Sequence, residues 1–493
     1  MKFRLTVLIV FSLCLSNVFA DEGMWLLGNL RKNKQTDRVM KELGLQMPVN
    51  KIYDPKKPCL ADAVVSFGGF CSGVVVSEDG LVFTNHHCGF SSIQQHSSVE
   101  HDYLKDGFFA RSLEEELPNP ELYVRFLLRT EDVTKRVLSA ARHAKTETER
   151  RVAVDSIMNV ISMEVSEKDS TLTGIVDAYY AGNEFWLSVY RDYNDVRLVF
   201  APPSSVGKFG WDTDNWMWPR HTGDFSVFRV YAGPDNRPAD YSPENRPYKA
   251  EKFLKISLGG YDEGDFAMIM GFPGSTQRYM TSYEIDRLLE VENPQRIFIR
   301  GERQAILKED MAASAKVRIQ YASKYAQSSN YWKNSIGKSR GIRRLDVKGR
   351  KQEQEAAFTA WAAKNTLPTE GYSNALNLIR ESVEEMAPYF ASSQYLSEAI
   401  GRSVEILVPA RLAVSKKGGE LTEALKAFYK DYNMPTDRRV AKRMFRIVGE
   451  NCMELPSVFA EVIGKRFGGD TDAYVDYLYD NSVFADERKA LAA

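Results

Sequence analysis

The spacing of apolar residues changes along the chain near residue 280. Before that point, short apolar runs are separated by turn residues. In "SGVVVSEDGLVFT" (72–84), Asp79-Gly80 divides two apolar runs, which predicts a β-hairpin. Further strands are predicted by "AVVSF", "VRLVF", "FSVFRVYAG", "LKISLGG" and "FAMIMGF", four of which follow residue 190. The part between about 60 and 280 is therefore expected to be mainly β.

Helical periodicity occurs in one stretch of this β part and dominates after it. Within 131–164, apolar residues recur at i, i+3, i+4 and i+7, which predicts a helix that interrupts the strands: Val154, Ile157, Met158 and Ile161. Thr281 and Glu284 have the spacing of a capping box at the start of a helix. A later apolar helical face is predicted from Leu376, Ile379, Val383 and Met386. We expect residues 280–493 to be helical.

Length and charge restrict the class of protein. A chain of 493 residues exceeds one ordinary hydrophobic core, so at least two domains are expected. The formal net charge of −1 gives no electrostatic reason to expect a nucleic-acid partner or an anionic membrane surface. The composition, with 44% hydrophobic and 27% charged residues, is that of a globular protein.

The first twenty residues have the features of an export signal. Lys2 and Arg4 precede an apolar stretch that ends near Leu15, and Val18-Phe19-Ala20 resembles a cleavage site. The apolar stretch is shorter than the ~20 residues that span a bilayer, which argues against a membrane anchor. We expect cleavage after Ala20 and export to the periplasm or cell surface, where disulfides are permitted.

Four cysteines follow this segment. Cys71 and Cys88 flank the predicted hairpin, so they are expected to face each other across it as a disulfide, whereas Cys59 and Cys452 have no evident partner.

The histidines suggest two kinds of chemistry. In "LVFTNHHCGF", His86 and His87 lie between an apolar run and Cys88, a setting suited to a general base held in one orientation. A metal site formed by His86, His87, His96 and His101 is the alternative. The sequence lacks a HExxH helix or paired CxxC motifs, so no metal is expected.

The stretch "WDTDNWMWPRHTGDFSVFRVYAG" (211–233) offers carboxylates that could accept a hydrogen bond from His87. Asp224 lies where polar residues enter a predicted strand, and a buried carboxylate there would need a partner such as His87. Asp212 and Asp214 compete for this role but have the setting of loop acids. Asn215 and Trp216 could line a ligand pocket, one as a polar contact and the other as a wall.

Five stretches of the chain are unusual in sequence: "TNHHCG", "APPSSVGKFG", "DTDNWMWPRHTGDFSVFRVYAG", "GFPGST" and "YASKYAQSSNYWKNSIG". Together they resemble the bacterial dipeptidyl-peptidase 7/11 family of serine peptidases. The resemblance extends from about residue 21 to the end of the chain. It implies an α+β multidomain fold, a chymotrypsin-like double β-barrel with a large inserted α-helical domain. The corresponding segments are a signal peptide (1–20), the β-barrel part (21–277) and the helical domain (278–493).

The resemblance also implies residue roles. The catalytic histidine and aspartate fall on His87 and Asp224, and the residues that hold the α-amino group of the substrate fall on Asn215 and Trp216. It implies release of dipeptides from peptides with a free N-terminus, without a cofactor. The family tends to dimerise, so a homodimer is a further expectation. Similarity to dipeptidyl-peptidase 7 suggests bulky apolar residues at the second position, with an acidic preference as the alternative.

The serine of the expected Ser-His-Asp triad is not found. Ser72 precedes a glycine but lies upstream of His87, and Ser275 in "GFPGST" matches a different strand-turn of the family. We expect the serine motif beyond Ala493, in a C-terminal part that this chain lacks, and therefore no hydrolysis by the chain alone. Two alternatives stay open: a peptide-binding relative that has lost its nucleophile, and a metal-dependent hydrolase.

Overall fold

The computed structural model describes residues 25–30, 34–275, 277–365 and 371–493. The predicted signal peptide lies outside the described residues. All described strands lie in residues 64–247, here called the sheet region, and residues 282–492 form the helical region. The strands are β1 (Val64–Phe67), β2 (Cys71–Val75), β3 (Leu81–Thr84), β4 (Phe108–Phe109), β5 (Leu117–Pro118), β6 (Val124–Asp132), β7 (Leu172–Tyr179), β8 (Glu184–Tyr193), β9 (Asp195–Ala201), β10 (Ser226–Ala232) and β11 (Arg246–Pro247).

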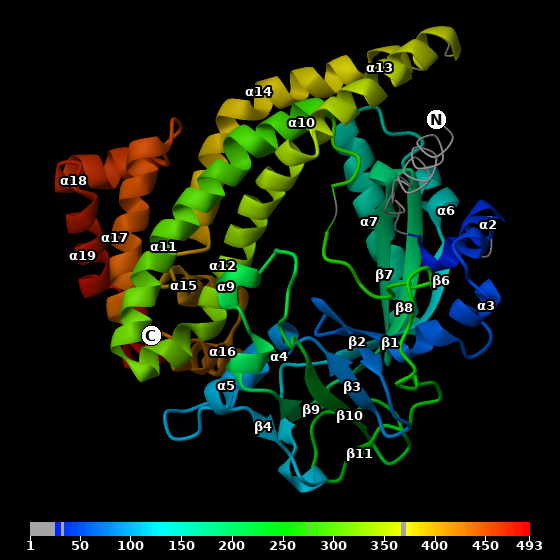
Figure 1. Cartoon of the computed structure of the whole chain (residues 1–493). Helices are drawn as coiled ribbons and strands as arrows, with labels where there is room; N and C mark the ends of the chain where they lie inside the picture. The colour runs from blue at the N-terminus through cyan, green and yellow to red at the C-terminus, as the bar shows by residue number, and fades with distance from the viewer. Residues whose placement is uncertain (1–24, 31–33, 276, 366–370) are drawn as a thin grey trace, which may run out of the picture.

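The α-helices surround the sheet in the first half of the chain and pack on one another in the second (Figure 1). The first group is α2 (Lys34–Glu42), α3 (Val49–Ile52), α4 (His86–Gln95), α5 (Tyr103–Asp106), α6 (Thr134–Ala140), α7 (Glu147–Lys168), α8 (Ser204–Gly207) and α9 (Trp211–Asp214). The second is α10 (Ser282–Arg287), α11 (Asn293–Ala313), α12 (Ala315–Arg344), α13 (Val347–Asn365), α14 (Ala375–Tyr395), α15 (Leu407–Ser415), α16 (Gly418–Lys430), α17 (Met434–Asn451), α18 (Lys465–Phe467), α19 (Thr471–Asn481) and α20 (Glu487–Ala492). No helix in the described ranges is both long and apolar enough to cross a bilayer.

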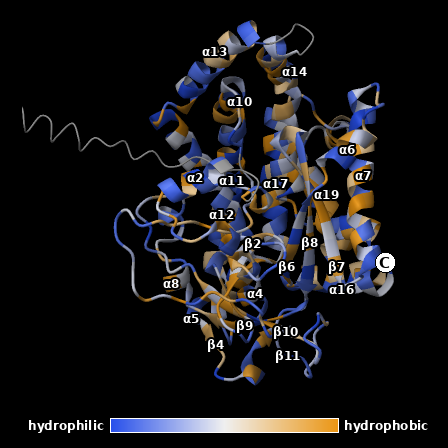
Figure 2. Ribbon diagram, turned by 90° about the vertical axis from the view of Figure 1, so that its right-hand side faces the viewer, coloured by the Kyte–Doolittle hydropathy of each residue, from blue (hydrophilic) through white to orange (hydrophobic). Residues whose placement is uncertain are grey.

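The strands form one antiparallel sheet in the order β4-β9-β10-β3-β2-β1-β6-β8-β7, with β11 on β10 and β5 on β9. The predicted hairpin is present, because Val74 of β2 pairs with Phe83 of β3 and Gly80 takes the positive φ that its turn requires. Hydrophobic residues gather on the strands around β4, β9 and β10 (Figure 2). Phe67, Val82 and Phe228 are fully buried in this core.

Two expectations for the sheet region are wrong in detail. The helix expected within 131–164 is two helices, α6 and α7, and strands resume at Leu172 rather than after residue 190. The runs "LKISLGG" and "FAMIMGF" form no strand. Leu258 and Ile269 are almost fully exposed, and few bonds tie this segment to the sheet, among them Leu254 N–H to Val75 C=O and Phe272 N–H to Ser72 Oγ. An apolar run without a neighbouring strand cannot form a ladder.

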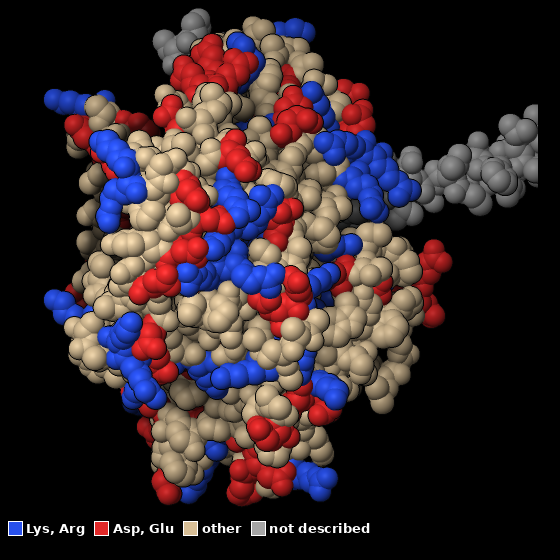
Figure 3. Space-filling view, turned by 90° about the vertical axis from the view of Figure 1, so that its left-hand side faces the viewer, with Lys and Arg blue, Asp and Glu red and all other residues tan. Residues whose placement is uncertain are grey.

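The helical region has a second core and a charged outer face. Ile299, Leu307 and Met444 are fully buried in this core. The predicted capping box is present at α10, where Thr281 and Glu284 bond to each other's backbone N–H. The apolar stripe predicted on α14 is less buried than expected, since Met386 is exposed. Basic and acidic side chains intermingle on the side where α17 and α19 lie (Figure 3), and Arg438 and Lys442 of α17 pair there with Asp476 of α19.

Helix α4 connects the two regions. Its first turn carries His87, and Gln94 near its other end accepts a hydrogen bond from Ser323 N–H of α12 at 2.7 Å and donates one to Asp431 at 2.8 Å. Lys430 donates to the carbonyl of Gln95, the last residue of α4. The helix that bears the candidate base is therefore bonded to the helical region at its opposite end.

Candidate active site

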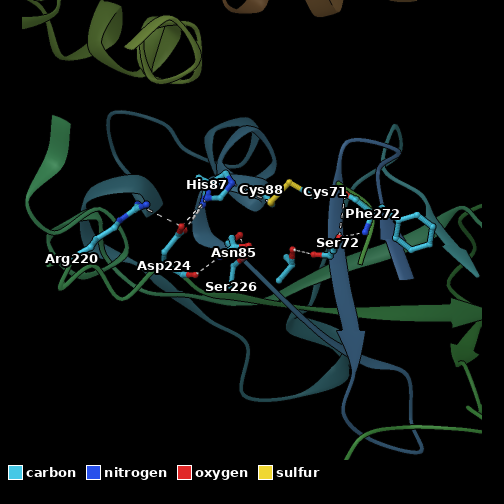
Figure 4. Close-up of a disulfide and its surroundings, with 10 residues drawn as sticks. Cys71, Ser72, Asn85, His87, Cys88, Arg220, Asp224, Ser226 and Phe272 are labelled. Carbon is cyan, nitrogen blue, oxygen red and sulfur yellow. Dashed lines mark hydrogen bonds and ion pairs between the residues drawn. A yellow bond between two sulfur atoms is a disulfide. The ribbon is translucent and has the colours of Figure 1, made fainter. Parts of the chain in front are cut away.

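His87 and Asp224 are brought together at the junction of β3, α4 and β10. Strand β3 ends at Thr84, and His87 lies in the first turn of α4. Asp224 lies two residues before β10, which pairs with β3. Although 137 residues separate them, the neighbouring strands therefore place both at the same edge of the sheet, and the two side chains point toward each other (Figure 4).

Two hydrogen bonds fix the histidine on the carboxylate. His87 Nδ1 lies 2.7 Å from Asp224 Oδ2, and the backbone N–H of His87 donates to Oδ1 at 2.9 Å. Asn85 donates to the backbone carbonyl of Asp224 at 3.0 Å, and its own carbonyl accepts from Ser226 Oγ. This bonding orients the imidazole while leaving most of its ring in solvent.

The ionised form of Asp224 is favoured. Burial raises the pKa of this carboxyl, but the hydrogen bonds and charge of His87, together with Arg220 at 3.7 Å, outweigh burial and hold the pKa below its usual value. An ionised Asp224 can only accept, so Nδ1 carries the proton and the lone pair of Nε2 is available. That tautomer is the one a general base requires.

Next to the histidine, Cys71 and Cys88 form a disulfide with 6.1 Å between their Cα atoms. The Cys88 sulfur lies 3.5 Å from His87 Nε2 (Figure 4). Within the described part of the chain, Cys71, His87 and Cys88 are the one cluster of three potential metal-ligating side chains. Both sulfurs are bonded to each other and supply no thiolate.

The other histidines considered for a metal site do not join this cluster. His96 bonds to Asn119 at 3.2 Å, and the ring of His101 stacks on Tyr103. His86 is buried with its Nε2 unpaired among the described residues, and burial lowers its pKa to about 4. A Cβ on Gly207 would come within 2.5 Å of the His86 ring, so the close approach of this loop requires glycine.

Asn215 and Trp216 form a second polar group with α12. Asn330 Oδ1 accepts from Asn215 Nδ2 at 3.1 Å and from Trp216 Nε1 at 2.9 Å. Trp211 and Trp216 both have positive φ, which is strained for bulky residues and indicates that the surroundings fix this loop. Asp212 accepts from Tyr325 at 3.1 Å and also from Ser329, so this competing acid binds α12 and not His87.

Sequence reasoning did not single out Asn330 or Lys208. The ammonium of Lys208 lies over the rings of Phe90 in α4 and Trp211, and so bridges the helix of His87 to the loop of Trp216. Asn330 lies inside the long helix α12, where asparagine is an unfavourable residue. That local conflict was one signal, and another was that Asn330 and Lys208 both lie in stretches that resemble the family.

The two serines considered for the nucleophile lie elsewhere. Ser72 Oγ accepts from the N–H of Phe272 at 2.7 Å, and its side chain is held against that backbone. Ser275 lies in the segment after Phe272 that forms no helix or strand. The His87 ring is bonded to Asp224, with the Cys88 sulfur beside it.

The chain is similar to known proteins over nearly all of its length. The family model described as Peptidase S46 matches residues 20–493. Dipeptidyl-peptidase 7 of Porphyromonas gingivalis is 47% identical over 94% of this chain and 66% of the relative. Dipeptidyl-peptidase 7 of Porphyromonas endodontalis is 46% identical over 99% of this chain and 61% of the relative. An Asp/Glu-specific dipeptidyl-peptidase of Porphyromonas gingivalis is 39% identical over 99% of this chain and 70% of the relative.

Solved structures give the same picture. The crystal structure of Porphyromonas endodontalis DPP11 in complex with the dipeptide Arg-Glu has a TM-score of 0.83 and 36% identity, covering 95% of this chain and 69% of that chain. The complex of the same protein with Arg-Asp has a TM-score of 0.84. The chain thus spans between 61% and 70% of the length of these relatives.

Proposed function

Because the chain belongs to the peptidase S46 family, we propose that it carries the general base, the orienting acid and the amine-binding group of an exported serine dipeptidyl-peptidase. The observation that carries the proposal is the pair of hydrogen bonds from His87 to Asp224, at 2.7 and 2.9 Å. This arrangement holds one tautomer and leaves Nε2 open, as a serine peptidase requires.

In the proposed mechanism a serine hydroxyl gives its proton to His87 Nε2 while its oxygen attacks the carbonyl of the second residue of the peptide. Asp224 stabilises the imidazolium that forms. The imidazolium then protonates the leaving amine, and water activated by the same histidine hydrolyses the acyl-enzyme. The serine in this proposal is none of the residues that the structure describes. The chemistry needs no cofactor.

Release of dipeptides needs a fixed distance between the N-terminus and the attacked bond. The Asn215 amide nitrogen donates to Asn330, which leaves Asn215 Oδ1 to accept from an ammonium group. Asn330 Oδ1 already receives two bonds and orients both partners. We propose that Asn215 and Trp216, both oriented by Asn330, bind the free α-amino group of the peptide and thereby select the second peptide bond.

Several finer features also belong to the proposal. The antiparallel sheet is inferred to be part of a chymotrypsin-like double β-barrel, which is supported by the similarity to the solved relatives. Export, a homodimer and a preference for a bulky apolar second residue stay predictions from the sequence.

The amine-binding step is tested by calorimetric titration of the 493-residue chain with a dipeptide and with its N-acetyl form. The free dipeptide is expected to bind, and acetylation is expected to abolish binding because it removes the charge. Asn215→Ala should weaken binding about tenfold, the loss of about one hydrogen bond to a charged group. Asn194→Ala, an exposed amide that donates to Asp240, is the matched control. Equal affinity for both forms would contradict the proposed role of these residues.

The catalytic step is tested by fluorophosphonate labelling of two samples, the 493-residue chain and a form of the protein that hydrolyses peptides (the hydrolytically active protein). Each is also labelled as a His87→Ala variant. We expect labelling of the active protein that His87→Ala abolishes, and none of the 493-residue chain. Labelling of this chain that depends on His87 would mean that a described serine is the nucleophile. Labelling of neither would contradict the serine mechanism, because peptides would then be hydrolysed without an activated serine.

A further inference from the structure

A polar cavity of about 240 Å3 lies in the helical region and is partly open, because two of its lining residues, Tyr331 and Arg402, are exposed. It is bounded by α11, by α12 and by the π-helical turn Leu396–Gly401 with the two residues after it. Six of the side chains that line it are Arg300, Arg303, Arg402, Glu398, Ser328 and Tyr331. The lining thus holds three cations against one carboxylate, and two of the cations, Arg300 and Arg303, are buried.

The carboxylates nearby are already shared. Glu398 lies 2.8 Å from Arg300, 3.5 Å from Arg296 and 4.0 Å from Arg402. Arg303 reaches Glu405 only at 3.7 Å, and Lys324 is bonded to the same carboxylate. Positive charge is therefore in excess around the cavity, where low dielectric strengthens every electrostatic interaction.

The excess positive charge affects the guanidinium of Arg300. Burial lowers the pKa of its guanidinium; Glu398 raises it, and the neighbouring cations Arg296 and Arg303 lower it, so that the pKa stays below its usual value. A buried guanidinium that its carboxylate does not fully compensate favours another anion beside it.

One buried donor lacks an acceptor here. Arg303 is more than nine-tenths buried, and its Nε–H has no hydrogen-bond partner in the described part of the chain. A buried donor without an acceptor is costly, so this one calls for a ligand. The hydroxyl of Ser328, which accepts from Gln304 at 3.4 Å, also lines the cavity.

We propose that this cavity binds a small oxyanion of the phosphate type. Guanidinium groups present paired N–H donors that match the oxygens of phosphate, and the excess charge selects an anion over a neutral ligand. The volume corresponds to roughly eight water molecules at about 30 Å3 each, which is enough for a phosphate ion with part of its hydration. The shared chemistry would be met by free phosphate or by a small phosphomonoester.

The site is placed where it can stiffen the helical region. The oxyanion would join Arg303 of α11, Ser328 of α12 and Arg402, which follows the π-helical turn. Ser328 and Tyr331 face this cavity, whereas Asn330 of the same helix faces Asn215 and Trp216. The anion therefore lies at a joint of three elements and not in the proposed peptide site.

The test is calorimetric titration of the full chain with inorganic phosphate at constant ionic strength set by sodium chloride. We expect one saturable site. Arg303→Met keeps the length of the side chain and should abolish binding. Arg402→Ala removes a side chain that is 65% exposed, so the fold is kept, and should weaken binding about tenfold. Arg380→Ala, which removes a surface cation paired with Glu384, should leave binding unchanged. A parallel titration with glycerol phosphate distinguishes a phosphomonoester from free phosphate as the tighter ligand.

The outcomes separate the alternatives. Saturable binding that weakens in Arg402→Ala but not in Arg380→Ala supports the site, even if Arg303→Met does not fold. Absence of saturable binding to the folded chain overturns the proposal. Binding that all three variants retain equally overturns it as well, because the anion would then bind elsewhere.

Discussion

The sheet region and the helical region both bury titratable side chains, but they favour opposite protonation states. In the sheet region, buried His86 is neutral, because burial lowers its pKa to about 4. In the helical region, burial raises the pKa of Asp437 to about 7, with Glu405 adding to the effect. Acid therefore opposes folding at the first site and favours it at the second.

The buried charges also differ in what surrounds them. Asp224 is bonded to a side chain that is mostly in solvent and free to react. Glu398 and Glu405 are enclosed and bonded to arginine and lysine. Under the proposed function, the sheet region places a charge pair for chemistry, whereas the charges of the helical region pair between its helices. Four substitutions test this contrast.

The largest expected effect is on the reaction. In Asp224→Asn, the side-chain amide would donate a hydrogen bond to His87 Nδ1. The proton of the imidazole would then lie on Nε2, which could no longer act as the base. We expect kcat of the hydrolytically active protein to fall about 10⁴-fold, with little change in thermal stability. Steady-state kinetics and thermal unfolding measure both, with Asp235→Asn as a control at an exposed acid. A loss of activity only in proportion to lost stability would contradict a catalytic role.

The helical counterpart should lose stability instead. Glu398→Gln leaves the buried guanidinium of Arg300 without its carboxylate, so the free energy of unfolding is expected to fall by about 3–5 kcal/mol. Glu384→Gln breaks an exposed pair and should cost below about 0.5 kcal/mol. Denaturant titration compares the two. Similar small losses in both variants would show that the buried network does not stabilise the helices.

The pH dependence of the sheet region follows from His86. Its unfolded pKa is near 6.5 and its folded pKa about 4, so its contribution is complete above pH 6.5 and is lost as pH falls toward 4. The shift corresponds to about 3 kcal/mol. The neighbouring charges are Asp224, Lys208 and His87. Hydrogen exchange of β3 and β10 between pH 4 and 7 should show this loss, and His86→Gln should remove most of it. An unchanged slope in the variant would assign the effect to other groups.

Asp437 should give the opposite trend. Its folded pKa lies above the unfolded value, so its contribution is present at low pH and is lost as pH rises toward about 7. Bonds from Tyr479 and from the backbone N–H groups of Glu405 and Ile406 stabilise the ionised form and keep the pKa of Asp437 from rising further. Exchange of α17 should slow as pH falls, after correction for intrinsic rates, and Asp437→Asn should abolish that trend. Equal trends in wild type and variant would exclude this carboxyl as the cause.

The sequence alone determined the features that depend on near neighbours. Asp79-Gly80 specifies a hairpin and Thr281 with Glu284 a capping box, because both act within one turn. The residues around His87 indicated a general base, and those around Asp224 indicated a carboxylate that needs a partner. The residues offered His87 and Asp224 as one of several possible pairs and the resemblance favoured that pair, whereas only the pairing of β3 with β10 brings them together.

The tertiary structure decided what depends on contacts between distant segments. Asn330 meets Asn215 across 115 residues, and nothing local to either residue specifies that bond. The runs "LKISLGG" and "FAMIMGF" have strand periodicity but no adjacent strand among the described residues, and so they do not form a ladder. The cavity at Arg303 arises from three elements that share two carboxylates. Periodicity in the sequence shows which face of a helix or strand is apolar. Only the tertiary packing determines which residues contact that face or pair with a buried charge.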